Sequence, residues 1–300
     1  MNMSYRELFV SPSAIFGGFQ SLFDEADYVI LGVPLDVTST FRAGCRFAPS
    51  AIRQASLNLE TYSFRADVDA EDLMVHDLGD LHVTGKVDET LSQLELVVRE
   101  ILEAQKLPVL IGGEHTIALG ATKGIDENIA IVSFDAHLDM RNEYMGLVTS
   151  HTTFMRRIYE QVKPQKILEI GTRAVCKEEL DFAKNQRIQF LTVQQIMEDG
   201  LKKTIQKIGN RLSESDKIYL TIDMDVLDPA FAPAVQNLEP EGLDMHTILE
   251  LLYEVCKHPI IAFDLVEVTP HYDTGTTTIQ SAKIILETLC YIEKRRKAQI

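Results

Sequence analysis

Short apolar runs rich in β-branched and aromatic residues alternate with longer helix-period segments along most of this chain. Such runs predict buried strands, because a strand covered on both faces shows no polar alternation. We expect strands at residues 28–33, 108–112, 129–134, 166–171, 188–193, 217–222 and 260–268. The segments between them, such as residues 89–106, place apolar residues at the helical period. This alternation predicts βαβ units and an α/β fold whose parallel sheet is covered by helices on both faces.

Length and composition favour one large domain. With 300 residues and 45% hydrophobic content, the chain can bury a sizeable core. Because no linker divides it, we expect a single domain over residues 1–300, beginning with an N-terminal arm of about 25 weakly patterned residues. The sequence has neither an apolar run of about 18 residues nor a signal-peptide layout, so we predict a cytoplasmic protein without a membrane span.

Charge and cysteine content argue against several classes of function. The formal net charge of −16 opposes binding to nucleic acid or anionic lipid, and mildly favours a cationic ligand or a bound metal. The four cysteines are scattered without a CxxC pair, so neither a disulfide framework nor a thiolate metal site is expected. The sequence also lacks the GxGxxG and GxxxxGK[ST] motifs of nucleotide-binding proteins.

Ionisable side chains concentrate where three of the predicted strands end. The strand at 129–134 leads into Asp135, His137 and Asp139, that at 217–222 into Asp223 and Asp225, and that at 108–112 into His115. In open α/β sheets the ligand site lies outside the carboxyl ends of the strands. Alternate residues of an extended segment share one face, so we expect these side chains to converge.

Carboxylates gathered in this way favour a pair of metal ions. Four of them in a sparsely hydrated cleft cannot all stay ionised without compensation, and two divalent cations would cancel the charge. Paired metals in hydrolytic sites lie about 3.5–4 Å apart. Oxygen and imidazole ligands without sulfur suit Mn²⁺, Mg²⁺ or Fe²⁺. A single aspartate after a strand is more often a turn former or helix cap, but DxHxD and DxD after two strands favour metal ligation.

The segments that carry these residues resemble the ureohydrolases, the arginase and agmatinase family, in sequence and in order. They are GVPLDVTSTFRAGCRFAPSAIR (32–53), GGEHT (112–116), SFDAHLDMRNEY (133–144), SHTTFMRR (150–157), TIDMDVLDPAFAP (221–233) and VEVTPHYDTGTTTIQSA (266–282). The resemblance implies a three-layer α/β/α fold with an eight-stranded, mainly parallel sheet, two Mn²⁺ ions per subunit, and homotrimers or homohexamers. The family's metal ligands then fall on His115, Asp135, His137, Asp139, Asp223 and Asp225.

The resemblance also implies a reaction, the hydrolysis of a guanidino group. A metal ion lowers the pKa of bound water from about 15.7 to roughly 7, which supplies a nucleophile for a poorly electrophilic carbon. His151 aligns with the histidine proposed to shuttle a proton in the family, a role that suits a side chain titrating near about 6.5. Glu267 aligns with the glutamate that pairs with the guanidinium, in a bidentate contact that would orient it.

Residues 139–151 resemble agmatinases more than arginases, which favours agmatine as the substrate, cleaved to urea and putrescine in polyamine biosynthesis. Two departures leave the substrate open. Ala234 to Leu238 replace small, flexible residues of a family pocket loop, and Thr152 replaces a glycine beside His151, where a β-branched residue disfavours positive φ. Guanidinobutyrate, arginine, aminopropylagmatine and formiminoglutamate stay open as substrates, as does a non-catalytic metal-binding regulator. A dinuclear metallophosphatase is disfavoured because the sequence lacks a GNHE-like element.

Overall fold

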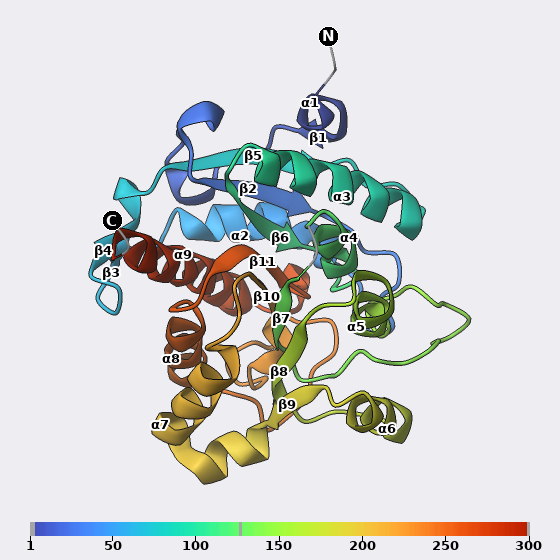
Figure 1. The fold of residues 1–300 in the computed structure, drawn as a ribbon. Helices are drawn as coiled ribbons and strands as arrows, with labels where there is room; N and C mark the ends of the chain where they lie inside the picture. Colours follow the sequence, from blue (N-terminus) through green and yellow to red (C-terminus); the bar gives the residue numbers. More distant parts are fainter. Residues whose placement is uncertain (1–3, 126–127, 299–300) are drawn as a thin grey trace.

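The computed structural model describes residues 4–125 and 128–298, and at its centre lies a nine-stranded sheet (Figure 1). In spatial order the strands are β1 (Val10–Ser11), β5 (Val75–Leu81), β2 (Tyr28–Val33), β6 (Leu107–Gly112), β11 (Ile260–Val266), β10 (Ile218–Asp223), β7 (Ala130–Phe134), β8 (Lys166–Thr172) and β9 (Gln189–Thr192). All the pairings from β5 to β9 are parallel, whereas β1 pairs antiparallel with β5. A small separate ribbon pairs β3 (Tyr62–Ser63) with β4 (Val68–Asp69).

Helices cover both faces of the sheet and give the molecule three layers (Figure 1). On one face α2 (Ala48–Ser56), α7 (Val193–Leu212), α8 (Met245–Val255) and α9 (Thr276–Lys297) share a core with strand residues such as Val109 and Val132. On the other, α3 (Val87–Glu103), α4 (Ile117–Lys123), α5 (Phe154–Arg157) and α6 (Lys177–Asn185) share a core with Leu110 and Ile131. The predicted three-layer α/β/α fold is confirmed.

Shorter helical segments connect these elements. They are α1 (Tyr5–Phe9), a π-helical turn at Ile158–Val162, and 3₁₀ turns at Phe16–Gly18, Phe23–Glu25, Cys45–Phe47, Ala70–Asp72, Met224–Val226 and Pro270–Tyr272. In residues 4–125 and 128–298, no helix combines the length and apolar character needed to cross a membrane. All four cysteines belong to the described residues and are free thiols, as their spacing predicts.

The expected strands are confirmed, with ends that shift by one or two residues. The helix expected at residues 89–106 is α3. The eight strands that the resemblance implies correspond to β5 through β9 in spatial order, and β1 adds a short antiparallel strand at the edge. This edge strand comes from the N-terminal residues, whose α1 segment is tied to α3 where Glu100 accepts from the Ser4 hydroxyl and the Tyr5 N–H.

Strand β5 was not predicted, because its sequence VHDLGDL alternates buried and partly exposed residues instead of forming an apolar run. Its Asp77 is buried and forms a two-pronged ion pair with the fully buried Arg53 of α2, with both N–O distances at 2.8 Å. Paired and hydrogen-bonded charges of this kind can be buried. Burial of Asp77 in β5 therefore depends on Arg53, which comes from a helix elsewhere in the sequence. The periodicity of the strand alone does not reveal this pairing.

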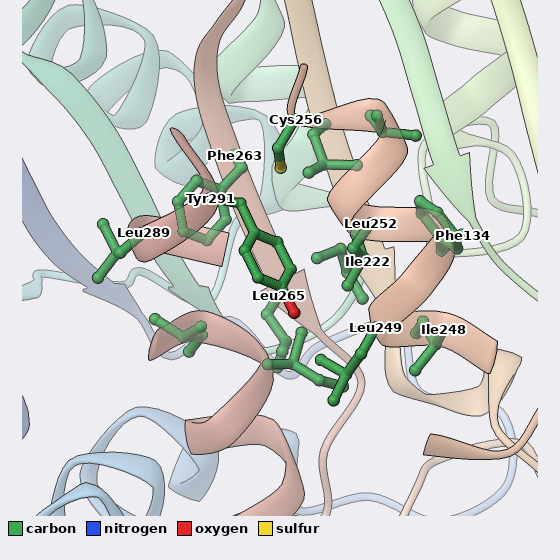
Figure 2. Packing of buried hydrophobic residues seen from close by; sticks show 14 of the residues in the cluster. Phe134, Ile222, Ile248, Leu249, Leu252, Cys256, Phe263, Leu265, Leu289 and Tyr291 are labelled. Carbon is green, nitrogen blue, oxygen red and sulfur yellow. The ribbon is translucent and has the colours of Figure 1, made fainter. Parts of the chain in front are cut away.

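Large side chains beneath the strand ends fix the register of the central strands (Figure 2). Phe134 and Ile222, the residues before Asp135 and Asp223, are fully buried in the core shared with α8 and α9. A slip of one residue would turn both side chains to the opposite face of the sheet. The packing thus determines where Asp135 and Asp223 emerge at the carboxyl ends of β7 and β10.

Candidate active site

The ionisable residues lie at the carboxyl ends of four neighbouring parallel strands. His115 follows β6, Glu267 follows β11, Asp223 ends β10, and Asp135 follows β7. In the sequence β7 is the next strand after β6, but in the sheet β11 and β10, which come later in the chain, lie between them. Such a switch in strand order opens the crevice in which α/β proteins bind ligands.

His115 forms the centre of one cluster. Its Nδ1 lies 3.1 Å from an oxygen of Asp135, 3.2 Å from one of Asp223 and 3.8 Å from one of Asp139. The imidazole is fully buried, and the ring of Phe154 packs against it with centroids 4.0 Å apart. Among the described residues, Nδ1 has no hydrogen-bond partner of acceptable geometry. A buried imidazole nitrogen is thus directed at three carboxylates.

His137 forms a second cluster beside the first. Its Nδ1 lies 3.0 Å from an oxygen of Asp225 and 3.5 Å from Oδ1 of Asp135. The other oxygen of Asp135 is the one near His115, so this carboxylate lies between the two clusters. Both groups, His115 with Asp135 and Asp139, and Asp135 with His137 and Asp225, have the spacing of metal-binding side chains.

The loop after β7 brings its residues together in a way that the sequence did not predict. Residues 135–139 do not continue the strand, and Asp139 has a left-handed backbone with φ of 50°. The expectation of an extended segment is therefore wrong here. Asp135 Oδ1 accepts the N–H of His137 at 2.6 Å, and Asp223 Oδ1 accepts the N–H of Asp225 at 2.8 Å. In each of these aspartates Oδ1 shapes the loop, and the other oxygen faces His115.

The donor set fits divalent cations. In the part of the chain that the structure describes, the four aspartates pair with histidines and not with Lys or Arg. Burial, reinforced by the negative charges of Asp225 and Asp135, raises the pKa of Asp223 well above its usual range. Cations would relieve this concentration of charge. Oxygen and imidazole donors without sulfur, together with the unpartnered Nδ1 of His115, match Mn²⁺, Mg²⁺ or Fe²⁺.

Glu267 lies at the same rim with one oxygen available. Its backbone is left-handed, with φ of 69°, and its side chain is buried although it lines the pocket. Oε1 accepts the backbone N–H of His115 at 2.5 Å, whereas Oε2 has no hydrogen-bond partner among the described residues. The pocket itself has a volume of about 620 Å³. A buried carboxylate oxygen without a donor is suited to receive one from a ligand.

His151 lines the same pocket, just before α5. Burial, reinforced by the charges of His137 and His115, lowers the pKa of His151 to about 4. The imidazole is therefore neutral near pH 7 and able to accept a proton. The structure thus brings all eight predicted site residues to one edge of the sheet, six in the two clusters and two at the adjoining pocket.

Similar proteins identify the family. A sequence model described as "Arginase family" matches residues 26–290. The chain belongs to the arginase family. It is 36% identical to an agmatinase of Bacillus subtilis over 273 residues, which cover 89% of this chain and 92% of that protein. It is 34% identical to N(1)-aminopropylagmatine ureohydrolase of Thermococcus kodakarensis, over 87% of this chain and 89% of that protein. The crystal structure of agmatine ureohydrolase of Thermoplasma volcanium matches with a TM-score of 0.89 at 33% identity, covering 98% of this chain and 99% of that one.

This arginase-family protein is thus a ureohydrolase, a metal-dependent hydrolase acting on small guanidino compounds, and it resembles agmatinases most. The first departure from the family sequence affects the pocket less than expected. Ala234, Val235 and Gln236 are buried, and of the altered residues Asn237 and Leu238 line the pocket. The altered wall of the ureohydrolase pocket is therefore restricted to Asn237 and Leu238.

The second departure is also milder than the sequence suggested. Thr152 is absent from the residues of the described chain that have positive φ, so its β-branched side chain does not strain the backbone there. Its hydroxyl lies 3.1 Å from that of Ser150. Nothing in this geometry displaces His151 from the ureohydrolase pocket.

Sequence reasoning missed residues that support the ureohydrolase site. Arg173, after β8, donates to the carbonyl oxygens of Asp225 and Glu239 at 2.7 Å each, which links a cluster to the pocket loop. Thr38 contacts the ring of His151, and Glu114 accepts a hydrogen bond from Thr38. Both belong to segments with recognised resemblance, but a threonine in a loop and a glutamate beside a histidine carry no specific signal by themselves.

Proposed function

We propose that this ureohydrolase hydrolyses the guanidino group of a small cationic substrate, with agmatine, which yields urea and putrescine, as the first candidate. The observation that carries the proposal is the buried, unpartnered Oε2 of Glu267 beside the two His/Asp clusters. A guanidinium stays charged to a pKa above about 12 and presents planar N–H donors, which a carboxylate accepts. The names of the relatives from B. subtilis and T. volcanium support agmatine.

We propose that two Mn²⁺ ions are held by the clustered residues. His115, Asp135, Asp139 and Asp223 would supply one group of ligands, and His137 and Asp225 would complete the other with the shared Asp135. When bound, such ions would lower the pKa of a coordinated water to roughly 7 and so supply the nucleophile.

The chain's own residues would bind the substrate and move the proton. Glu267 would accept guanidinium N–H groups at Oε2 and so orient the carbon over the clusters, with its other oxygen fixed by the His115 N–H. Neutral His151 would accept at a ring nitrogen the proton that the attacking water releases, and would deliver it to the amine nitrogen as the C–N bond breaks. The amine then leaves as a stable neutral or ammonium species.

The substrate tail is the least constrained feature. Glu239 lines the pocket with a partly exposed carboxylate and would face a cationic tail, as agmatine and aminopropylagmatine both have. The latter is named as the substrate of the T. kodakarensis relative. Assembly into homotrimers or homohexamers, which the family resemblance implies, is also part of this proposal. One domain with an N-terminal arm and a cytoplasmic location are part of it too, and rest on the sequence pattern.

A substrate panel with Mn²⁺ present tests the proposal. Urea release would be measured with agmatine, aminopropylagmatine, guanidinobutyrate and arginine, and formamide release with formiminoglutamate. Turnover of a cationic guanidino compound that is lost in Glu267→Gln and His151→Asn would support it. Tight metal binding without turnover of any compound would instead favour the non-catalytic regulator.

A further inference from the structure

His151 is held between two threonines of one loop. Thr38 and Thr40, in the segment that follows β2, place their hydroxyl oxygens 3.1 Å from Nδ1 and Nε2 respectively. The backbone N–H of His151 also donates to Thr38 Oγ1 at 3.1 Å. The histidine is 4% exposed, so bulk water does not compete strongly for these contacts.

Behind Thr38 lies Glu114, whose carboxylate is fully buried and receives four donors. Oε2 accepts the backbone N–H groups of Val37 and Thr38, both at 2.7 Å. Oε1 accepts the hydroxyls of Thr38 at 2.8 Å and Thr116 at 2.7 Å. Backbone N–H groups can only donate and an ionised carboxylate can only accept. Hydrogen bonds to a charged acceptor are the stronger kind, so the Thr38 hydroxyl proton points to Glu114.

The direction of that proton determines the protonation of the histidine ring. A threonine hydroxyl has one proton and two lone pairs. Because the Thr38 hydroxyl donates its proton to Glu114, Thr38 Oγ1 can only accept hydrogen bonds from His151. One lone pair accepts the backbone N–H of His151, and the other faces Nδ1. Nδ1 must therefore carry the proton. In a neutral imidazole Nε2 is then the acceptor, and the Thr40 hydroxyl donates to it.

We propose that Glu114 and Thr38 are positioning residues that hold His151 as its Nδ1–H tautomer, leaving Nε2 as the atom that exchanges a proton at the pocket. The assignment deepens the proposed function, because it rests on His151 as the proton shuttle. Glu114 acts through Thr38 in the way that a buried carboxylate orients a catalytic imidazole. When Nε2 gains a proton, Thr38 and Glu114 stabilise the imidazolium. Nδ1–H still donates to the Thr38 oxygen, whose own proton is hydrogen-bonded to the Glu114 carboxylate.

The loop is anchored by contacts that do not involve His151. Asp36 Oδ2 accepts the N–H of Gly44 at 2.9 Å, and the Ser39 hydroxyl, 2.5 Å from Asp36 Oδ1 and 2.6 Å from Gln236 Oε1, donates to the Asp36 carboxylate. These contacts remain when the hydroxyl of Thr38 is removed. Thr38→Val, which has nearly the same shape, therefore removes the hydroxyl while the loop retains its anchors.

The tautomer can be measured without turnover. Ring ¹⁵N shifts of the full-length protein labelled at histidine distinguish protonated from unprotonated nitrogens, and His151→Asn assigns the signal. The spectra are recorded without added Mn²⁺, which is paramagnetic. We expect protonated Nδ1 in the wild type and in Thr38→Ser, and a shift to protonated Nε2 in Thr38→Val. Thr40→Val, the same substitution at the other ring nitrogen, should leave Nδ1 protonated. Protonated Nε2 in the wild type would overturn the proposal.

Glu114→Gln gives a second, sharper test. The amide oxygen would keep the two backbone N–H donors, and the NH₂ group would face Thr38 and Thr116. The Thr38 oxygen would then accept from the amide, and its proton would turn toward His151 Nδ1. The tautomer should reverse although every group still has a partner. An unchanged Nδ1–H signal in a folded Glu114→Gln protein would refute the role of Glu114.

Kinetics link the tautomer to the reaction. In Thr38→Val we expect kcat for the best panel substrate to fall roughly tenfold or more, up to the roughly 10²–10⁴ that a positioned proton donor contributes in full. KM and metal content should stay unchanged, and Thr38→Ser should restore kcat. If no compound is hydrolysed, the proposed function fails while the ¹⁵N result still stands. A reversed tautomer with unchanged kcat would show that His151 does not need this positioning.

Discussion

Replacing Glu267 by Gln tests the substrate-binding step most directly. Gln has the same shape, and its amide oxygen can still accept the His115 N–H that Oε1 accepts at 2.5 Å. The NH₂ group would then occupy the place of Oε2, which has no protein donor in the described chain. A guanidinium arriving there would meet a neutral donor in place of a negatively charged acceptor.

The size of the effect follows from these contacts. Because Oε1 is already engaged, the substrate gains mainly the charge-assisted hydrogen bonds to Oε2, and such a bond contributes about 1.5–3 kcal/mol. Facing two donors toward each other adds part of the cost of an unsatisfied buried group, so we expect a loss in the upper part of this range, about 2–3 kcal/mol. At about 1.4 kcal/mol for each factor of ten, kcat/KM should fall roughly 30-fold to 150-fold.

The assay is steady-state urea release with agmatine, accompanied by metal analysis of the same protein sample. Glu267→Gln should retain the metal content of the wild type, because among the described residues the Glu267 side chain accepts a hydrogen bond only from the backbone of His115. Glu239→Gln is a matched control, since Glu239 lines the same pocket but is 38% exposed in its side chain, and exposed charges contribute about 0–1 kcal/mol. Full activity of Glu267→Gln, or equal losses in both variants, would refute the reasoning.

Three further variants probe the metal clusters, a sequence departure and the fold. Asp223→Asn should lower metal stoichiometry and activity together, and unchanged metal content by elemental analysis would count against its role as a ligand. Thr152→Gly should alter turnover by less than about threefold, because Thr152 has no positive φ to relieve; a large gain in kcat would contradict this. Arg53→Met should lower the free energy of unfolding by about 3–5 kcal/mol, because it leaves Asp77 buried without its ion pair. Urea denaturation measures that loss, and the double variant with Asp77→Asn should recover part of it.

The central strands and the clustered residues could be predicted because their signals are local. An apolar run such as residues 129–134 indicates a strand buried on both faces, and ionisable residues at the end of that run have few structural explanations. The same logic failed for residues 135–139. Periodicity predicted an extended segment, but the N–H of His137 bonds back to the Asp135 side chain and Asp139 is left-handed. Hydrogen bonds between side chain and backbone decided the local structure there.

Contacts between distant segments could not be predicted in this way. Asp77 in β5 and Arg53 in α2 are buried as an ion pair, and burying either charge without the other would be unfavourable. The same holds for Thr38, whose role depends on Glu114 and His151. One sequence gives no information on such pairings, so it predicted the residues that cluster at the strand ends better than the residues that contact them from behind.

The turn after β6 shows why one short segment, GGEHT, has this composition. A side chain on Gly113 would place its Cβ 1.9 Å from the carbonyl oxygen of Leu35, so this position requires glycine. The close approach lets Gly113 accept the N–H of Glu267 at 2.9 Å and brings Glu114 within reach of Thr38. His115 then donates its N–H to Glu267 while its ring faces the aspartates. A larger residue at Gly113 would therefore displace His115, Glu267 and Glu114 together, and with them the proposed metal ligation, guanidinium binding and proton shuttle.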